Sequence, residues 1–429
     1  MNDINTLRLI LHVSDFHLTD NNEELEHAKK ALKSLTEKLK SEKIKIDYLV
    51  HTGDIINSSD IFDIVANELH IDDMYFTTEE GEPRRFNKKL FAQEADEEIK
   101  HKFDDAVKTI VERRFDVAAE IMRKFISDLN IPFGSVVICC GNHDVLRPFV
   151  IDKSISCKKE NDKWMYGYPE TLLMNFMPFE NFLNQLGVAN SQSRCAQTEP
   201  VSICTLDNLN FLILNTNWQN PKKQKEGYYC INCERVRDSI TKLYEDLDSQ
   251  DYINIVLAHK PIYEICEKTR LAYKRYIKTP FMSDIQKFTG ENGLYFCGDK
   301  HTRSIIASQI HDIPHYFSGE PLNISHDKTE DVSEVEYNLI EIFKNKIGME
   351  RKIHLKYNKE NTWTCEIRPQ DAVVSKLYKL SKKHIVKNAF ETIAGPKNFD
   401  SWENLCQEIY GWKMGEMNDW VSNLNNLFL

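Results

Sequence analysis

The chain has 429 residues, of which 41% are hydrophobic, and a formal net charge of −11. This length and composition suffice for one large domain with an appendage or for two ordinary domains, and the acidity disfavours general binding to polyanions. The sequence contains no run of about 18 uncharged apolar residues and no basic-then-apolar leader at its start, so we expect a cytoplasmic protein without membrane contacts.

The first third of the sequence predicts a parallel β-α-β unit. Residues 7–13 form an almost continuous apolar run, typical of a strand covered on both faces. Leucine and alanine recur at helical spacing over residues 25–39, and residues 46–50 form a second apolar strand. Residues 58–113 are polar and charged, which indicates an insertion. It either folds over the functional site and restricts access to it, or forms a surface elaboration or oligomer contact.

The same alternation continues through the rest of the chain. A helical pattern over residues 115–126 is followed by apolar strands, and a helix is expected at 233–247. The predicted strands are 136–140, 211–217, 253–258 and 293–297, with late antiparallel strands near 337–343 and 354–366. Beyond Pro369 the pattern is helical to the end, which predicts a domain over 1–368, containing the 58–113 insertion, and a C-terminal helical region over 369–429.

Polar residues that can bind metal ions follow five of the apolar strands. They are Asp15 and His17, Asp54, Asn142 and His143, His259, and Asp299 and His301. A single aspartate or histidine at a strand end is usually a cap or a turn residue. Five such loops in series are expected to meet, because ligands bind beyond the carboxyl ends of strands in α/β sheets.

The donor types indicate a hydrolytic metal centre. Carboxylates, imidazoles and an amide oxygen suit Mn²⁺, Fe or Zn²⁺ better than a thiolate site or an all-oxygen calcium site would. Asp15 and His17 can point to the same side and bind one ion, and Asp54 can bridge two ions about 3.5–4 Å apart.

This ordered series of motifs resembles the calcineurin-like metallophosphoesterases, and looks most similar to their cyclic-nucleotide phosphodiesterase-like branch. The motifs span residues 7 to about 301, and the strand pattern extends the resemblance to about 345. The resemblance implies an α/β fold of the metallophosphoesterase type, an αββα sandwich of mixed sheets flanked by helices. The inserted helical segment and the C-terminal helical appendage would be additions to it.

The resemblance also implies a role for each matching residue. Asp15, His17 and His301 would hold one divalent ion, Asn142 and His259 the other, and Asp54 would bridge them. His143 would stabilise the transferring phosphoryl group or protonate the leaving oxygen, with Asp144 orienting it. One position departs from the family pattern Gly-His-x-His, because Asp299 stands where the first histidine is expected. We expect Asp299 to ligate the second ion through oxygen; the alternative is that it is too short and this ion is weak or absent.

The implied activity is hydrolysis of a phosphodiester or phosphomonoester by a water that bridges two divalent ions, with Mn the first expectation and Fe, Zn or Mg as options. The phosphoester substrate could be a nucleotide or a nucleic acid. One alternative is a DNA or RNA nuclease that works with a partner protein. A second is a catalytically silent scaffold whose C-terminal helices bind a protein partner.

Overall fold

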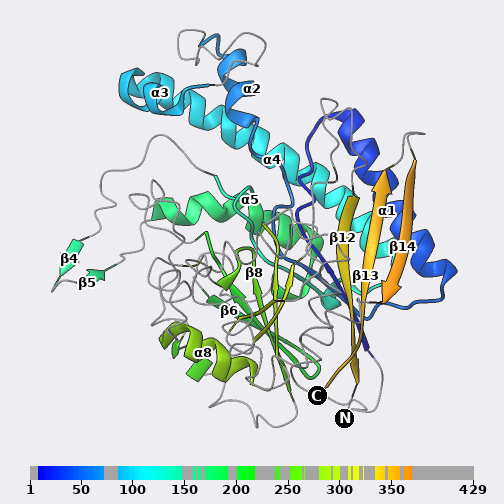
Figure 1. The fold of residues 1–429 in the computed structure, drawn as a ribbon. Helices are drawn as coiled ribbons and strands as arrows, with labels where there is room; N and C mark the ends of the chain where they lie inside the picture. The colour runs from blue at the N-terminus through cyan, green and yellow to red at the C-terminus, as the bar shows by residue number, and fades with distance from the viewer. Residues whose placement is uncertain are drawn as a thin grey trace, which may run out of the picture.

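The chain folds into a sandwich of two β-sheets with helices on the outside (Figure 1). The computed structural model describes most of residues 8–369. The described residues are 8–71, 86–146, 158–160, 163–165, 170–191, 201–217, 237–238, 240–241, 252–262, 265, 280–290, 293–299, 308–310, 313–317, 322, 334–343, 346–357 and 362–369.

The first sheet has six strands in the order β14-β13-β12-β1-β2-β3. In chain order these strands are β1 (Arg8–Val13), β2 (Tyr48–His51), β3 (Val136–Ile138), β12 (Glu334–Phe343), β13 (Lys346–Tyr357) and β14 (Trp363–Pro369). β1, β2 and β3 run parallel, whereas β12 pairs antiparallel with β1 and continues into β13 and β14. The predicted β-α-β unit and the antiparallel strand near 337–343 are therefore confirmed, whereas the segment 354–366 contains the end of β13 and the start of β14.

The second sheet also has six strands, in the order β10-β11-β9-β8-β7-β6. Its members are β6 (Val201–Leu206), β7 (Leu209–Leu214), β8 (Ile253–Ala258), β9 (Leu294–Cys297), β10 (Ser308–Ile310) and β11 (Ile313–Phe317). The outer pairs β6-β7 and β10-β11 are antiparallel, and the inner pairs are parallel. Both sheets are thus mixed, and a separate short hairpin joins β4 (Lys158–Glu160) to β5 (Lys163–Met165).

Apolar side chains from both sheets form the layer between them. Ile10 and Val50 of the first sheet belong to one buried cluster with Phe211, Ile255 and Leu257 of the second. Strands covered on both faces need apolar residues at consecutive positions, which explains the unbroken apolar runs in the sequence. The predicted αββα sandwich is confirmed, and the packing of two sheets brings their strand ends to one edge.

Helices cover the outer face of each sheet. α1 (Asn22–Ser41) packs on β13 and β14, and α8 (Pro280–Thr289) packs on β8. The Asn21 side chain accepts hydrogen bonds from the N–H groups of Glu23 and Glu24, so it caps the first turn of α1. The leucines spaced three and four residues apart in α1 are buried, as predicted.

The insertion is helical and extends beyond the sandwich. It contains α2 (Ile61–Glu68), α3 (Lys88–Glu94) and the first part of α4 (Glu97–Asp128), and Figure 1 shows α2 and α3 projecting from the body of the molecule. The predicted helix over 115–126 is therefore only the second half of α4. Its first half was missed because its exposed face is densely charged, although Phe103 and Val107 on the other face are buried.

Several elements were not predicted. α5 (Glu170–Leu186) contains Pro178, which is unfavourable inside a helix, and α8, β6, β10 and β11 are short or weakly patterned. The helix expected at 233–247 lies almost entirely outside the described residues, and so does the C-terminal region from residue 370. The boundary between domains at 368 and 369 stays a prediction. Among the described helices, none combines the length and the apolar character needed to cross a membrane.

Candidate metal centre

The loops that follow β1, β2, β3, β8 and β9 meet at one edge of the sandwich. Two backbone hydrogen bonds join the first two loops, from Asp15 N–H to the Gly53 carbonyl and from His17 N–H to the Asp54 carbonyl, both at 3.0 Å. The Gly298 N–H donates to the His259 carbonyl at 3.1 Å and joins the two loops of the second sheet. The site is therefore held by backbone contacts.

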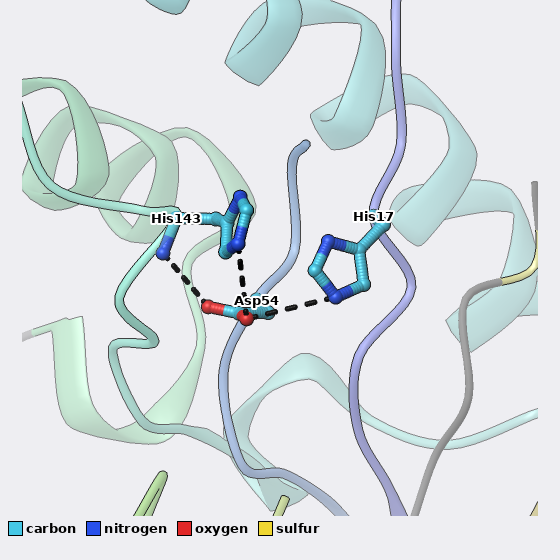
Figure 2. Close-up of side chains that lie close together, drawn as sticks. All are labelled: His17, Asp54 and His143. Atoms are coloured by element: carbon cyan, nitrogen blue, oxygen red, sulfur yellow. Dashed lines mark hydrogen bonds and ion pairs between the residues drawn. The ribbon is translucent and has the colours of Figure 1, made fainter. Parts of the chain in front are cut away.

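Four of the predicted ligands have left-handed backbone conformations. The φ angles are 56° for Asp15, 48° for His17, 54° for Asp54 and 70° for Asp299. Such conformations are uncommon for residues other than glycine, and they collect at functional sites where the surrounding fold enforces them. From these turns the side chains of His17 and Asp54 point toward one another (Figure 2).

Two glycines allow the β2 and β3 loops to touch. Gly53 has a φ of 98°, and a Cβ atom on it would lie 2.5 Å from the Gly141 nitrogen. A Cβ atom on Gly141 would overlap the backbone nitrogen and Oδ1 of Asp54. The Asp54 carboxylate can reach the Asn142–His143 turn only because neither position carries a side chain.

Asp54 lies at the centre of the site and contacts residues from several loops. Its Oδ2 lies 3.2 Å from Nε2 of His259, 3.6 Å from Nε2 of His17 and 4.0 Å from Nε2 of His143. Its Oδ1 accepts a hydrogen bond of 2.8 Å from the His143 N–H (Figure 2). The ligand atoms form two compact groups that share Asp54, namely His17 with His143 and Asp15 with His259. A carboxylate shared between two groups of donors is what bridging of two ions requires.

The backbone of the β2 loop fixes the orientation of the His259 ring. Its Nδ1 lies 2.8 Å from the Thr52 carbonyl, which can only accept, so Nδ1 carries a hydrogen and Nε2 faces Asp54. Nε2 also lies 3.0 Å from Oδ1 of Asn142. The backbone of the β2 loop thus prepares this histidine as a metal ligand.

Asp299 lies on the same side of the centre as His259. Its Oδ1 is 3.6 Å from Nε2 of His259 and forms an ion pair with Lys260, and its N–H donates to both carboxylate oxygens of Asp15 at 3.2 Å. Asp299 therefore lies next to the second group of donors, and its role as a ligand stays a prediction. His301 lies outside the described residues, so its expected role stays a prediction.

His143 and Asp144 have different surroundings from those that the family pattern implies. Nδ1 of His143 lies 3.0 Å from the Ser58 nitrogen and 3.2 Å from the Ser58 hydroxyl. Asp144 is buried, and its two carboxylate oxygens accept hydrogen bonds from the N–H groups of Ile55, Ile56 and Gly141 at 2.8–3.2 Å. Asp144 therefore fixes the turn that carries Asn142 and His143, and Ser58 contacts the imidazole in its place.

The electrostatics of the centre favour a cation. Asp15, Asp54 and Asp144 are all buried. Burial and the nearby Asp54 carboxylate raise the pKa of Asp144 to about 7. Burial alone would lower the pKa of His259, but the carboxylates of Asp54, Asp15 and Asp299 outweigh it and raise this pKa to about 10. Buried carboxylates at this density need positive charge, and the O and N donors fit Mn²⁺, Fe or Zn²⁺.

Arg114 of α4 connects the loops that carry the centre, and this role of Arg114 was not predicted from the sequence. Its side chain is 1% exposed and binds Asp20 beyond β1, with Nε–Oδ1 at 3.0 Å, and the Asn57 carbonyl beyond β2 at 2.5 Å. Nothing in the sequence pairs an arginine in a charged helix with loops more than 50 residues away. Ser58 and the Thr52 carbonyl were missed for the same reason, although both lie near the Gly53-Asp54 motif.

Comparison with known proteins gives one family match. The family model described as calcineurin-like phosphoesterase matches residues 8–303. None of the curated proteins matches the chain.

Two solved structures are similar to the chain at low sequence identity. GAP50, the anchor in the inner membrane complex of Plasmodium, aligns with 85% of this chain and 89% of its own length, at 12% identity and a TM-score of 0.34. A putative 5'-nucleotidase from Staphylococcus aureus, solved in complex with alpha-ketoglutarate, aligns with 88% of this chain and 58% of its own, at 10% identity and a TM-score of 0.28.

Proposed function

Because this chain belongs to the calcineurin-like phosphoesterase family, we propose that it hydrolyses a phosphodiester at a centre of two divalent metal ions. Family membership makes it a metal-dependent hydrolase that acts on phosphoric esters. One observation carries the finer proposal: Oδ2 of Asp54 lies within 4.0 Å of three histidines from three different loops.

The ligands divide around Asp54. Asp15 and His17, with Nε2 of His17 3.8 Å from Oδ1 of Asp15, would hold one ion together with His301 of the family motif, and Asn142, His259 and Asp299 would hold the other. Asp15 lies close to His259 as well, and His143 lies close to His17. When bound, two divalent ions supply a nucleophilic water at neutral pH and offset the charge that develops on the phosphoryl group. The contact between Nδ1 of His259 and the Thr52 carbonyl turns Nε2 toward Asp54, which supports the role of His259 as a ligand.

His143 is proposed to bind the phosphoryl group as a hydrogen-bond donor. The Ser58 N–H can only donate, so Nδ1 of His143 accepts and the hydrogen of the neutral ring stays on Nε2, on the side of Asp54. A neutral imidazole with its hydrogen on Nε2 is a good donor to a phosphoryl oxygen but a poor proton source for a leaving group. Of the two roles expected for His143, this contact favours stabilisation of the phosphoryl oxygen.

The same contact supports a diester as the substrate. A diester carries one negative charge at neutral pH, whereas a monoester carries up to two. The neutral His143 ring beside Asp54 suits a phosphate group with one negative charge, because a group with two charges binds more strongly to charged donors such as Arg or Lys.

The proposal is tested with bis(p-nitrophenyl) phosphate and Mn²⁺, on the wild-type protein and on Asp54→Asn, with the metal content of both determined. We expect turnover and two ions per chain in the wild type, and loss of turnover with fewer ions in the variant. Turnover that persists in Asp54→Asn, or a wild type that binds fewer than two ions, would contradict a centre bridged by Asp54.

A further inference from the structure

A cavity of about 130 Å³ lies beside His143, between the inserted helices and the β3 loop. Its polar part is lined by Ser58, Ser59, Asn142 and His143. The rest of its lining is apolar, from Ile61, Phe62, Val107, Val111, Val145 and Leu146. α2 and α4 therefore contribute a wall directly next to the residues proposed to handle the phosphoryl group.

This wall is firmly packed. Ile61, Val107 and Val111 are each at least 96% buried, and the Phe62 ring stacks on Phe103 of α4 with the centroids 5.7 Å apart. Arg114, three residues after Val111, ties α4 to the loop that carries Ser58. The cavity and His143 are thus held in one arrangement by the same helix.

The size and chemistry of the cavity limit what can enter it. An apolar cavity of about 150 Å³ in a protein holds one benzene molecule, so this one fits a group of about that size. The apolar side of the cavity gives no partner to a hydroxyl or a charge, and burying such a group there without a partner is unfavourable. Sugar and phosphate units of a nucleic-acid chain are therefore poor occupants of the apolar side.

We propose that this cavity binds an apolar group about the size of one aromatic ring, attached to the phosphorus held at His143. The proposal rests on the proposed function, since it needs the phosphoryl group at the metal centre. The insertion then acts as a specificity element that selects compact apolar esters.

Binding of two phosphonates to the Mn²⁺-loaded protein tests this. Phenylphosphonate and methylphosphonate share one head group and are not hydrolysed, so isothermal titration calorimetry reports the contribution of the ring alone. We expect phenylphosphonate to bind about tenfold more tightly than methylphosphonate. In Val111→Phe, which fills the cavity, this ratio should fall to about one while methylphosphonate binding is unchanged.

Val117→Phe is the matched control, because Val117 lies on the same helix but does not line the cavity, and it should keep the wild-type ratio. Val145→Phe fills the cavity from the β3 loop and replaces Val111→Phe if circular dichroism shows that the latter is unfolded. Equal affinities in the wild type, or a ratio that both filled variants retain, would overturn the cavity proposal alone. If neither phosphonate binds but the wild type hydrolyses bis(p-nitrophenyl) phosphate, the cavity proposal fails alone; if hydrolysis is absent as well, the proposed function is wrong.

Discussion

The guanidinium of Arg114 binds both carboxylate oxygens of Asp60, with Nη1–Oδ1 at 2.7 Å and Nη2–Oδ2 at 2.9 Å. Asp60 follows the loop that starts at Asp54 and carries Ser58, so this pair connects the inserted helix to the proposed catalytic residues. Bidentate pairs of this kind fix orientation as well as distance.

Replacing Arg114 by methionine should reduce the free energy of unfolding by about 2 kcal/mol, because Asp20 and Asp60 lose their buried partner. The loss is moderate because both carboxylates are partly exposed to water. Chemical denaturation followed by circular dichroism measures this. The neighbouring Arg113→Met is the control, since Arg113 is 55% exposed and its ion pair with Asp20 should contribute less than about 1 kcal/mol. Equal effects of the two variants would argue against a bracing role for Arg114.

The contribution of Asp20 should depend on pH. Burial acts to raise the pKa of Asp20, but Arg114 and Arg113 outweigh it and hold the pKa below its ordinary value. A lowered pKa means that the stabilisation is present above the ordinary value of 3.8 and is lost as the pH falls through the folded-state pKa. The difference in unfolding free energy between wild type and Asp20→Asn should therefore shrink as the pH falls from about 5 to about 2. A difference that stays constant over this range would refute the ionic contribution.

His143→Gln should impair turnover while leaving the metal content intact, because His143 is proposed to contact the phosphoryl group. We expect kcat for bis(p-nitrophenyl) phosphate to fall about 10²–10³-fold. His70→Gln makes the same chemical change at an exposed histidine and should have wild-type kcat. Loss of one ion in His143→Gln would instead identify His143 as a ligand, an arrangement that its place beside His17 and Asp54 permits.

Gly141→Ala should damage the centre, since the added Cβ would overlap Asp54. We expect a loss of more than about 2 kcal/mol in unfolding free energy and reduced Mn²⁺ binding. Gly134→Ala is matched in chemistry, and its Cβ would meet no atom within 4 Å, so it should change stability by less than about 0.5 kcal/mol. Similar stability of the two variants would show that the β2 and β3 loops separate easily.

Asp299→Ala tests whether Asp299 is a ligand. With its carboxylate gone, the group around His259 loses one oxygen donor, and Asp15, His17 and Asp54 remain. We expect the metal content measured by mass spectrometry to fall from two ions to about one. Asp105→Ala, at an exposed position on α4, should keep two. Retention of both ions in Asp299→Ala would mean that Asp299 forms an ion pair with Lys260 and does not bind a metal ion.

Sequence and structure agree most closely where local pattern decides the outcome. Residues 7–13 and 253–258 were recognised as strands because both faces of β1 and β8 are buried, which forces consecutive apolar residues. The first half of α4 was missed because its pattern is set by packing within the insertion, where Phe103 contacts Phe62, Phe86 and Phe91. A charged helix face gives no local sign of such a partner.

The sequence by itself determined which residues follow each strand and which metal-binding atoms they offer, because each motif lies within a few residues of a strand end. These atom types in turn indicated the class of reaction. Only the tertiary structure decided how close His143 and His259 come to Asp54. It also decided that the Thr52 carbonyl fixes the orientation of the His259 ring, and that Ser58, not Asp144, contacts His143. These are contacts between residues 85 to 207 positions apart, or backbone groups that every residue carries. Their formation depends on sheet packing and loop geometry, which no local pattern of side chains encodes.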